Sequence, residues 1–155
     1  MFAFRLYQKA LARRPILTQS ISAGFLAGTG DVICQTVVEQ RKRNQCDWLR
    51  TARFAGIISC FMAPSLFFWF RYLERFRGFF YPLKRVLIDQ AVAAPIFTYS
   101  LVTGLRLFEG HRLNVALSEA RQRFWPILMT NYKIWPFVQL LNFYFIPLQY
   151  RIIFG

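Results

Sequence analysis

The sequence predicts an all-α fold: an integral membrane bundle of four transmembrane helices, with a basic amphipathic helix at the N-terminus and a short interfacial helix before the last span. The chain is 55% hydrophobic and only 17% charged, whereas about a quarter of the residues of an ordinary soluble domain are charged. Its apolar runs are about as long as a helix that crosses a bilayer, and basic connections separate them. At 155 residues, we expect a single membrane domain, 1–155.

The first residues predict the basic amphipathic helix. Residues 1–30 contain four cations and no acid, and Arg5, Lys9 and Arg13 share one helical face. A basic, acid-free start of this kind is typical of mitochondrial import. A helix that only lies on the membrane surface before the first span is the alternative.

Four apolar segments are the expected spans, at about residues 18–38, 53–71, 86–106 and 130–151. Aromatic residues lie at or near the span ends, as interfacial rings do: Trp48, Tyr72, Tyr81, Trp125 and Tyr150. Before the last span, an apolar stripe opposite charged residues predicts the short interfacial helix. Within that span Pro147 cannot donate to the carbonyl of Phe143, so we expect a kink there. This pattern disfavours the alternative, a soluble protein with unusually apolar helices.

The net charge of +13 would suggest nucleic-acid binding in a soluble protein. Here the cations are spread over the connections between spans, and no nucleic-acid-binding motif accompanies them. We therefore expect the lipid bilayer as partner, with anionic lipids at the basic loops, and no direct contact with nucleic acid. Both membrane faces would carry similar numbers of cations, so the positive-inside rule does not give the orientation.

The sequence contains no pattern typical of an enzyme. It has no nucleophile–base pair, no two carboxylates at a workable spacing, and no cluster of cysteine and histidine. Its three cysteines lack the CxxC spacing of redox and metal sites. We therefore expect a protein that is not an enzyme, with no catalytic residue, no metal and no cofactor.

Polar residues inside the predicted spans are the candidate functional residues. They are Asp31, Gln35, Asp89, Gln90, Asn131, Lys133, Gln139 and Asn142. An ionisable group in a span costs about 2.5 to 3.5 kcal/mol, so each needs a partner or water. Two acids exceed one lysine, so either loop arginines reach inward or an acid is protonated. The set could line a solute path or hold helices together by hydrogen bonds, and the residues alone leave both open.

The first predicted span also carries a face of small residues. Ser20, Gly24 and Gly28 are spaced four apart, which allows another helix to approach closely. We expect this face to serve helix packing.

Several motifs resemble those of a known family. The last span matches the pattern WPxxQxxNFxx[VI]PxxxR at Trp135, Pro136, Gln139, Asn142, Phe143, Pro147 and Arg151. Asn131 before it, Gly30-Asp31 with Gln35, and Asp89-Gln90 followed by Pro95 fit as well. On these motifs the chain resembles the Mpv-seventeen/peroxisomal membrane protein family of small integral membrane proteins.

The chain also departs from that family in two places. The second span of the family commonly reads GPxxHxWY, but here residues 63–70 read APSLFFWF, with Phe67 and Phe70 in place of the histidine and the tyrosine. We therefore expect no pH-sensing role for this helix. Family members usually continue well beyond the arginine that matches Arg151, with an apolar tail, whereas this sequence ends at Gly155. Without that packing segment, activity would be in question.

The resemblance implies a four-span protein of the mitochondrial inner membrane, or less often of the peroxisomal membrane. Its relatives are associated with channel-like passage of small metabolites, with mitochondrial DNA maintenance through nucleotide supply, and with reactive-oxygen control. We therefore expect a channel or pore for small hydrophilic solutes. A scaffold that organises lipid or a protein complex is the alternative, and a peroxisomal membrane pore is another. Four short spans enclose little room, which makes a homo-oligomer possible.

Overall fold

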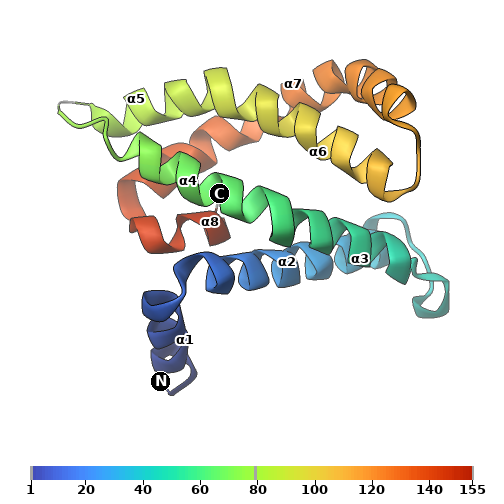
Figure 1. Cartoon of the computed structure of the whole chain (residues 1–155), viewed down its shortest axis with the longest axis horizontal. Coiled ribbons are helices and arrows are strands. Elements are labelled where there is room, and N and C mark those ends of the chain that lie inside the picture. Colours follow the sequence, from blue (N-terminus) through green and yellow to red (C-terminus); the bar gives the residue numbers. More distant parts are fainter. Residues whose placement is uncertain (1, 79, 155) are drawn as a thin grey trace. The chain divides into compact units, whose positions relative to one another are not determined.

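The computed structural model describes the backbone of residues 2–78 and 80–154, and their side chains except those of 2–4, 43, 153 and 154. Every regular element in this part of the chain is a helix (Figure 1), so the predicted all-α fold is confirmed. Contacts group the chain into two compact units, Met1–Ser65 and Leu66–Gly155, and the boundary falls inside one helix. The single membrane domain of the sequence analysis stays a prediction.

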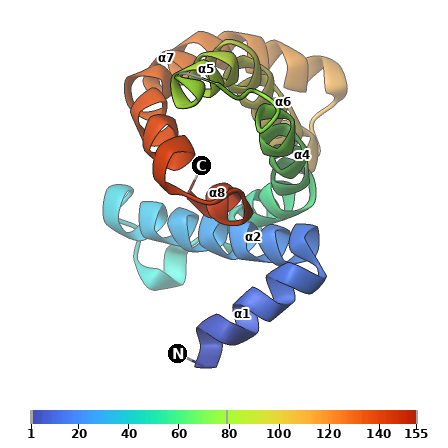
Figure 2. The same ribbon diagram turned by 90° about the vertical axis from the view of Figure 1, so that its left-hand side faces the viewer.

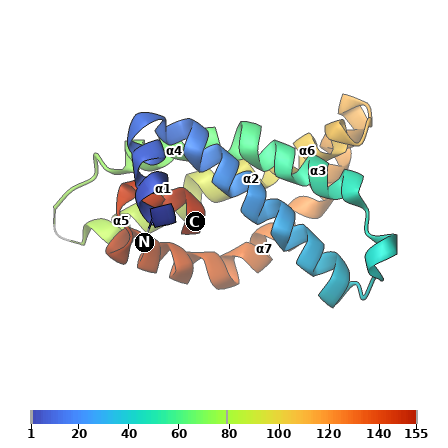
Figure 3. The same cartoon turned by 90° about the horizontal axis from the view of Figure 1, so that it is seen from below.

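The first unit contains two long helices connected by a short loop. Its helical segments are α1 (Phe2–Arg13), α2 (Pro15–Ile33), the π-helical η1 (Cys34–Val38), the 3₁₀ turn η2 (Arg43–Gln45), α3 (Trp48–Ile57), the π-helical η3 (Ile58–Met62) and the start of α4 (Ala63–Leu73). Pro15 is the first residue of α2, where its missing N–H has no helical partner to lose. Figures 1 and 3 show α2 and α3 side by side.

Small residues allow the close approach of α2 to α3 and η3. A Cβ placed on Gly24 would lie 2.8 Å from Cβ of Ser59 and 3.2 Å from the carbonyl oxygen of Ala55. The Ser59 hydroxyl donates to the backbone carbonyl of Ser20 across the same contact, at 2.9 Å. At Gly28 an added Cβ would meet Cβ of Ala55 at an ordinary 3.5 Å. The face of small residues therefore lies at the helix–helix contact of this unit.

The second unit contains the rest of α4, a helical pair, a long helix and two short helical segments after it. Its further segments are α5 (Tyr81–Ile88), the π-helical η4 (Asp89–Ala93), α6 (Ala94–Phe108), α7 (Leu113–Phe145), the 3₁₀ turn η5 (Leu148–Tyr150) and α8 (Arg151–Phe154). Both α5 and α6 pack against α7, which curves around them in Figure 2. Phe70 and Phe143 are fully buried and meet edge to face, with ring centroids 5.8 Å apart.

Three continuous helices are long and apolar enough to cross a membrane: Pro15–Val38, Trp48–Leu73 and Tyr81–Phe108. They cover the first three predicted spans. The first helix begins earlier than predicted, and the other two are longer than predicted at both ends. Large apolar side chains such as Phe25 and Phe68 remain exposed on them, as on helices that face lipid. These three helices are the candidate spans.

Each candidate span contains a π-helical segment: η1 ends the first span, and η3 and η4 interrupt the second and the third. In η3 the N–H of Ala63 donates to the carbonyl of Ile58, and in η4 the N–H of Ala94 donates to that of Asp89. In both cases the next residue is a proline, which has no N–H to continue the α-helical pattern. Widened turns of this kind occur often at functional sites.

The last helix differs from its prediction in both its start and its end. The expected interfacial helix is not separate, because α7 runs without a break from Leu113 to Phe145 and includes Pro126 and Pro136. The helix also ends well before Arg151. Ile146 is extended, with φ −96° and ψ 123°, as a residue before a proline tends to be. The expected kink at Pro147 is therefore wrong, since the helix has already ended there.

Candidate functional site

Most buried polar side chains of the described residues come from the three candidate spans and α7. They are Gln19, Ser20, Asp31, Gln35, Arg85, Asp89, Thr98, Gln139, Asn142 and Arg151. Their hydrogen bonds and ion pairs define three groups. We name them after their acids as the Asp31 cluster, the Asp89 cluster and the Glu74 cluster.

The Asp31 cluster connects the end of the first candidate span with the start of the second. Gln35 is fully buried, and its Nε2 donates to Oδ2 of Asp31 at 2.8 Å and to Oγ1 of Thr51 at 3.0 Å. The Thr51 hydroxyl donates to the same Asp31 oxygen at 2.6 Å. The Oε1 of Gln35 accepts the backbone N–H of Asp47 at 2.7 Å. One glutamine thus ties the connecting loop to both helices.

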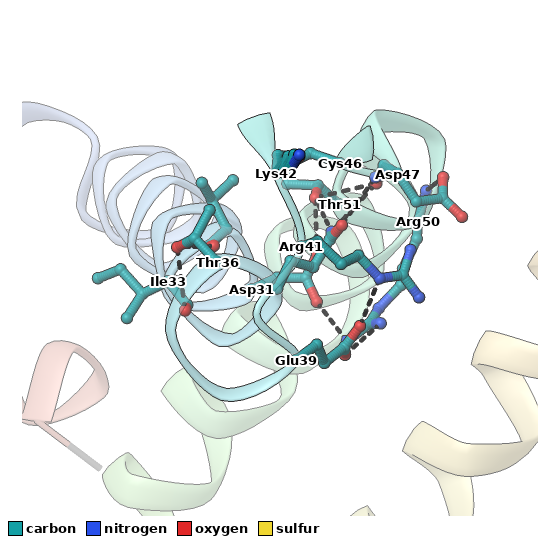
Figure 4. Close-up of polar contacts among 12 residues, drawn as sticks. Asp31, Ile33, Thr36, Glu39, Arg41, Lys42, Cys46, Asp47, Arg50 and Thr51 are labelled. Carbon is teal, nitrogen blue, oxygen red and sulfur yellow. Dashed lines mark hydrogen bonds and ion pairs between the residues drawn. The ribbon is translucent and has the colours of Figure 1, made fainter. Parts of the chain in front are cut away.

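An arginine from the second candidate span reaches the acid of the first. Nη2 of Arg50 lies 3.0 Å from Oδ1 of Asp31, and its Nη1 lies 2.7 Å from Oε1 of Glu39. Arg41 holds the other oxygen of Glu39 at 2.8 Å, and Figure 4 shows these charges gathered at one end of the helix pair. Asp47 caps α3 by accepting the N–H of Arg50. Asp31 is therefore paired with an arginine, which comes from α3 rather than from a loop.

The Asp89 cluster lies in the third candidate span, where η4 begins. Asp89 is 4% exposed, and its Oδ1 accepts the indole N–H of Trp69 at 2.8 Å. Its Oδ2 accepts Nε2 of Gln90 at 3.0 Å, and the backbone carbonyl of Gln90 accepts the hydroxyl of Tyr132 at 2.9 Å. Among the described residues no cation forms an ion pair with Asp89, and Oε1 of Gln90 is buried without a hydrogen-bond partner.

The Glu74 cluster joins three helical segments of the second unit. Glu74 lies directly after α4, and its Oε1 is 2.8 Å from Nη1 of Arg85 and also pairs with Nη1 of Arg151. Arg85 donates from Nε and Nη2 to the carbonyl of Phe76, at 3.2 and 3.1 Å. Arg151 donates from Nε to the carbonyl of Ile146 at 2.9 Å. One carboxylate thus holds two buried arginines.

Two amides of the last helix belong to the same region. Asn142 donates from Nδ2 to Oε1 of Gln139 at 3.1 Å and to the carbonyl of Arg151 at 3.3 Å. The second bond fixes the chain where it turns back after Pro147. The Oδ1 of Asn142 is buried and has no hydrogen-bond partner among the described residues.

The structure brings most of the predicted polar residues together, but not all. Asp31 and Gln35 bond to each other, as do Asp89 with Gln90 and Gln139 with Asn142. Asn131 instead donates to the hydroxyl of Thr98 at 3.3 Å. Lys133 is exposed and makes no ion pair with any described residue. It therefore does not join the clusters.

The family-signature residues differ in burial and in their place relative to α7. Phe143 is buried against Phe70, and Arg151 is buried in the Glu74 cluster. Pro136 lies inside α7, whereas Pro147 lies just outside it. Trp135 is 37% exposed on the surface of α7.

Sequence reasoning did not find several cluster members: Trp69, Glu74, Arg85 and Tyr132. For one of them a signal was present. Glu74 is the only acidic residue between Asp47 and Asp89, and it is surrounded by arginines and a lysine. A lone acid among cations is a good candidate for a shared partner. Trp69 and Tyr132 carry no such signal, because aromatic residues are frequent in the second and fourth predicted spans, where these two lie.

Comparison with known proteins identifies relatives over almost the whole chain. The chain is 37% identical to the mitochondrial inner membrane protein Mpv17 of Caenorhabditis briggsae, over 99% of this chain and 84% of the relative. It is 35% identical to the rat protein of the same name, over 98% and 88%. It is 36% identical to the protein SYM1 of Gibberella zeae, over 97% and 87%. No solved structure matches the chain.

The family profile agrees with these relatives. Residues 106–155, which include the last helix and the buried Arg151, match the profile of the Mpv17 / PMP22 family. The predicted family and the predicted mitochondrial location are therefore both confirmed. Identity at this level over nearly the full length makes the chain a member of the Mpv17 / PMP22 family and a protein of the mitochondrial inner membrane.

Proposed function

We propose that the protein forms a channel for small hydrophilic solutes across the mitochondrial inner membrane. The main support for this proposal is the burial of the acidic residue Asp89 inside a candidate span. This residue is 4% exposed within the candidate span Tyr81–Phe108, and in the described part of the chain its carboxylate accepts hydrogen bonds from Trp69 and Gln90 and forms no ion pair. An ionisable group at such a position is costly, and those that are retained commonly mark the path of an ion or solute.

The proposal includes a fourth membrane crossing, made by α7. This helix has 33 residues, which corresponds to a length of about 50 Å, more than the roughly 30 Å of a bilayer core. Only one charged residue, Lys133, lies between Arg123 and Arg151. Four crossings enclose little room, so the proposed pore is formed by several copies of the chain. No step in this function requires catalysis by the protein.

Passage of nucleotide precursors is the role that would connect such a pore to mitochondrial homeostasis. Supply of these precursors would support DNA maintenance and the control of reactive oxygen without any contact between the protein and DNA. The arginines near the span ends, such as Arg50 and Arg85, would attract such anions by their charge.

Planar-bilayer recording tests the channel. The purified protein is expected to give discrete openings, and Asp89→Asn should shift the reversal potential in a salt gradient because it removes a carboxylate from the path. Glu109→Gln is the matched control, since it removes the same charge just outside the span, which ends at Phe108. Silence of a folded, inserted protein, or a reversal potential that Asp89→Asn leaves unchanged, would contradict the proposal.

The second candidate function is a membrane scaffold that organises lipid or a protein complex. The Asp31 cluster favours it, because Asp31, Gln35 and Thr51 are hydrogen-bonded to one another and hold the helices together. A scaffold would give no conductance in the same recordings. Its stability would instead depend strongly on the lipid composition of the bilayer.

A further inference from the structure

A pocket of about 350 Å³ opens beside the Glu74 cluster, within the second unit. We call it the arginine pocket. Its lining residues are Glu74, Arg77, Gly78, Tyr81, Arg85 and Arg151. Three guanidinium groups face one carboxylate, so the pocket has an excess of positive charge.

Two of these arginines are already fixed in place. The guanidinium of Arg85 lies over the ring of Tyr81, with its Cζ 4.8 Å from the ring centroid, and donates to the carbonyl of Phe76. That of Arg151 lies 5.3 Å from the ring centroid of Phe143 and donates to the carbonyl of Ile146. A ligand that binds them would therefore not have to restrict their motion, which is a frequent cost of binding.

Arg151 and Arg77 have donors left for a ligand, whereas Arg85 already uses Nε, Nη1 and Nη2 on Glu74 and Phe76. A guanidinium carries five N–H groups, and the contacts of Arg151 with Ile146 and Glu74 use only Nε and Nη1. Arg77 is exposed and forms no ion pair with any described residue. The pocket thus combines two buried arginines with a third that is free to close on an anion.

The position of the pocket indicates which anions can reach it. Glu74, Arg77 and Gly78 lie in the connection between the candidate spans that end at Leu73 and begin at Tyr81. A connection between two helices that cross a membrane lies at a membrane surface, so these candidate spans would place the pocket near the lipid headgroups. Arginine forks match the tetrahedral oxygens of phosphate, and a phosphate dianion would balance the positive charge that Glu74 leaves.

We propose that the arginine pocket binds a phosphate group. The group can belong to an anionic lipid headgroup or to a soluble phosphate-bearing metabolite, since the two present the same oxygens. This inference is independent of the channel, because a scaffold could hold the same phosphate.

Thermal unfolding of the full chain in neutral detergent tests the pocket. Inorganic phosphate, compared with chloride at equal ionic strength, should raise the unfolding temperature of the wild type, because a ligand that binds only the folded state stabilises it. Arg77→Gln should weaken the apparent phosphate affinity about tenfold, since it removes a charge-assisted hydrogen-bond donor. Arg77 has no partner in the described structure, so the variant should unfold like the wild type without phosphate.

Arg75→Gln is the matched control. Arg75 is exposed in the same connection and lies over the ring of Tyr72, but it does not line the pocket. Its replacement changes the net charge by the same amount and should leave phosphate affinity within about twofold. Equal weakening by both substitutions would show only a general charge effect and would overturn the proposal.

Vesicles distinguish the two sources of phosphate. The protein is reconstituted in phosphatidylcholine with and without phosphatidic acid, and the unfolding temperature is measured with and without inorganic phosphate. Stabilisation by phosphatidic acid that depends on Arg77 assigns the site to a lipid headgroup. Stabilisation by inorganic phosphate alone assigns it to a soluble ligand. If neither probe stabilises the wild type more than Arg77→Gln, the pocket is not a phosphate site.

Discussion

The Asp31 cluster and the Glu74 cluster are both built from arginine–carboxylate pairs, but the first has a carboxylate for each arginine whereas the second has one carboxylate for two arginines. In the first, Asp31 and Glu39 share Arg50, whose side chain is 38% exposed. In the second, Arg85 and Arg151 share Glu74, and these two arginine side chains are only 5% and 7% exposed. Loss of one partner in the first cluster can be compensated by another partner or by water. In the second cluster, loss of the single carboxylate leaves two buried cations together.

Glu74→Gln should therefore have the largest effect. It should lower the free energy of unfolding by about 3 kcal/mol or more, because breaking a buried ion pair from one side leaves the partner charge uncompensated. Unfolding in a titration with sodium dodecyl sulfate, followed by circular dichroism, measures it. A loss below about 1 kcal/mol would mean that the two arginines are solvated and that the clusters do not differ.

Gly24→Ala should lower the free energy of unfolding by an intermediate amount. It tests whether the stability of the first unit depends more on close helix packing than on its ion pairs. The new Cβ would lie 2.8 Å from Cβ of Ser59, and such overpacking costs about 2 kcal/mol. Gly28→Ala is the control, since its Cβ would make an ordinary contact at 3.5 Å with Ala55. The same denaturant titration measures both, and equal stability of the two variants would argue against a tight contact.

Asp31→Asn should have the smallest effect, about 1 kcal/mol. Asparagine can still accept hydrogen bonds from Gln35 and Thr51, and Arg50 keeps Glu39. The two unfolding free energies, from Asp31→Asn and Glu74→Gln, directly compare the clusters. If Asp31→Asn lowered the free energy of unfolding as much as Glu74→Gln is expected to, Arg50 would not be able to replace Asp31 by another partner.

Much of the fold follows from the sequence because it depends on local patterns. Apolar runs between basic connections predict the helices that became the three candidate spans. Hydrogen bonds between residues three or four apart, such as Asp31 with Gln35 and Gln139 with Asn142, follow from helical spacing. The same reasoning misplaced the end of the last helix, because Pro126 and Pro136 are accommodated within it whereas the residue before Pro147 becomes extended.

Contacts between residues far apart in the sequence could not be predicted from the sequence. The bond from Trp69 to Asp89 and the pair of Glu74 with Arg151 depend on how the helices of the second unit pack. No spacing in a single sequence gives that arrangement. Lys133 shows the reverse case: its place inside an apolar run suggested a buried partner, but its position on α7 leaves it exposed.

The π-helical segment η4 has a consequence for the phase of the third candidate span. The N–H of Ala94 donates to the carbonyl of Asp89, five residues back, whereas each N–H of an α-helix donates four residues back. One extra residue turns the following helix by about 100°. Deleting a single exposed residue of η4, such as Val92, would keep the span apolar and nearly as long, yet would rotate Thr98 away from Asn131. Two homologous spans of equal hydropathy can therefore turn different side chains toward the neighbouring helices. A one-residue gap at this position of an alignment then indicates a rotation of the helix after η4 and hardly changes its length.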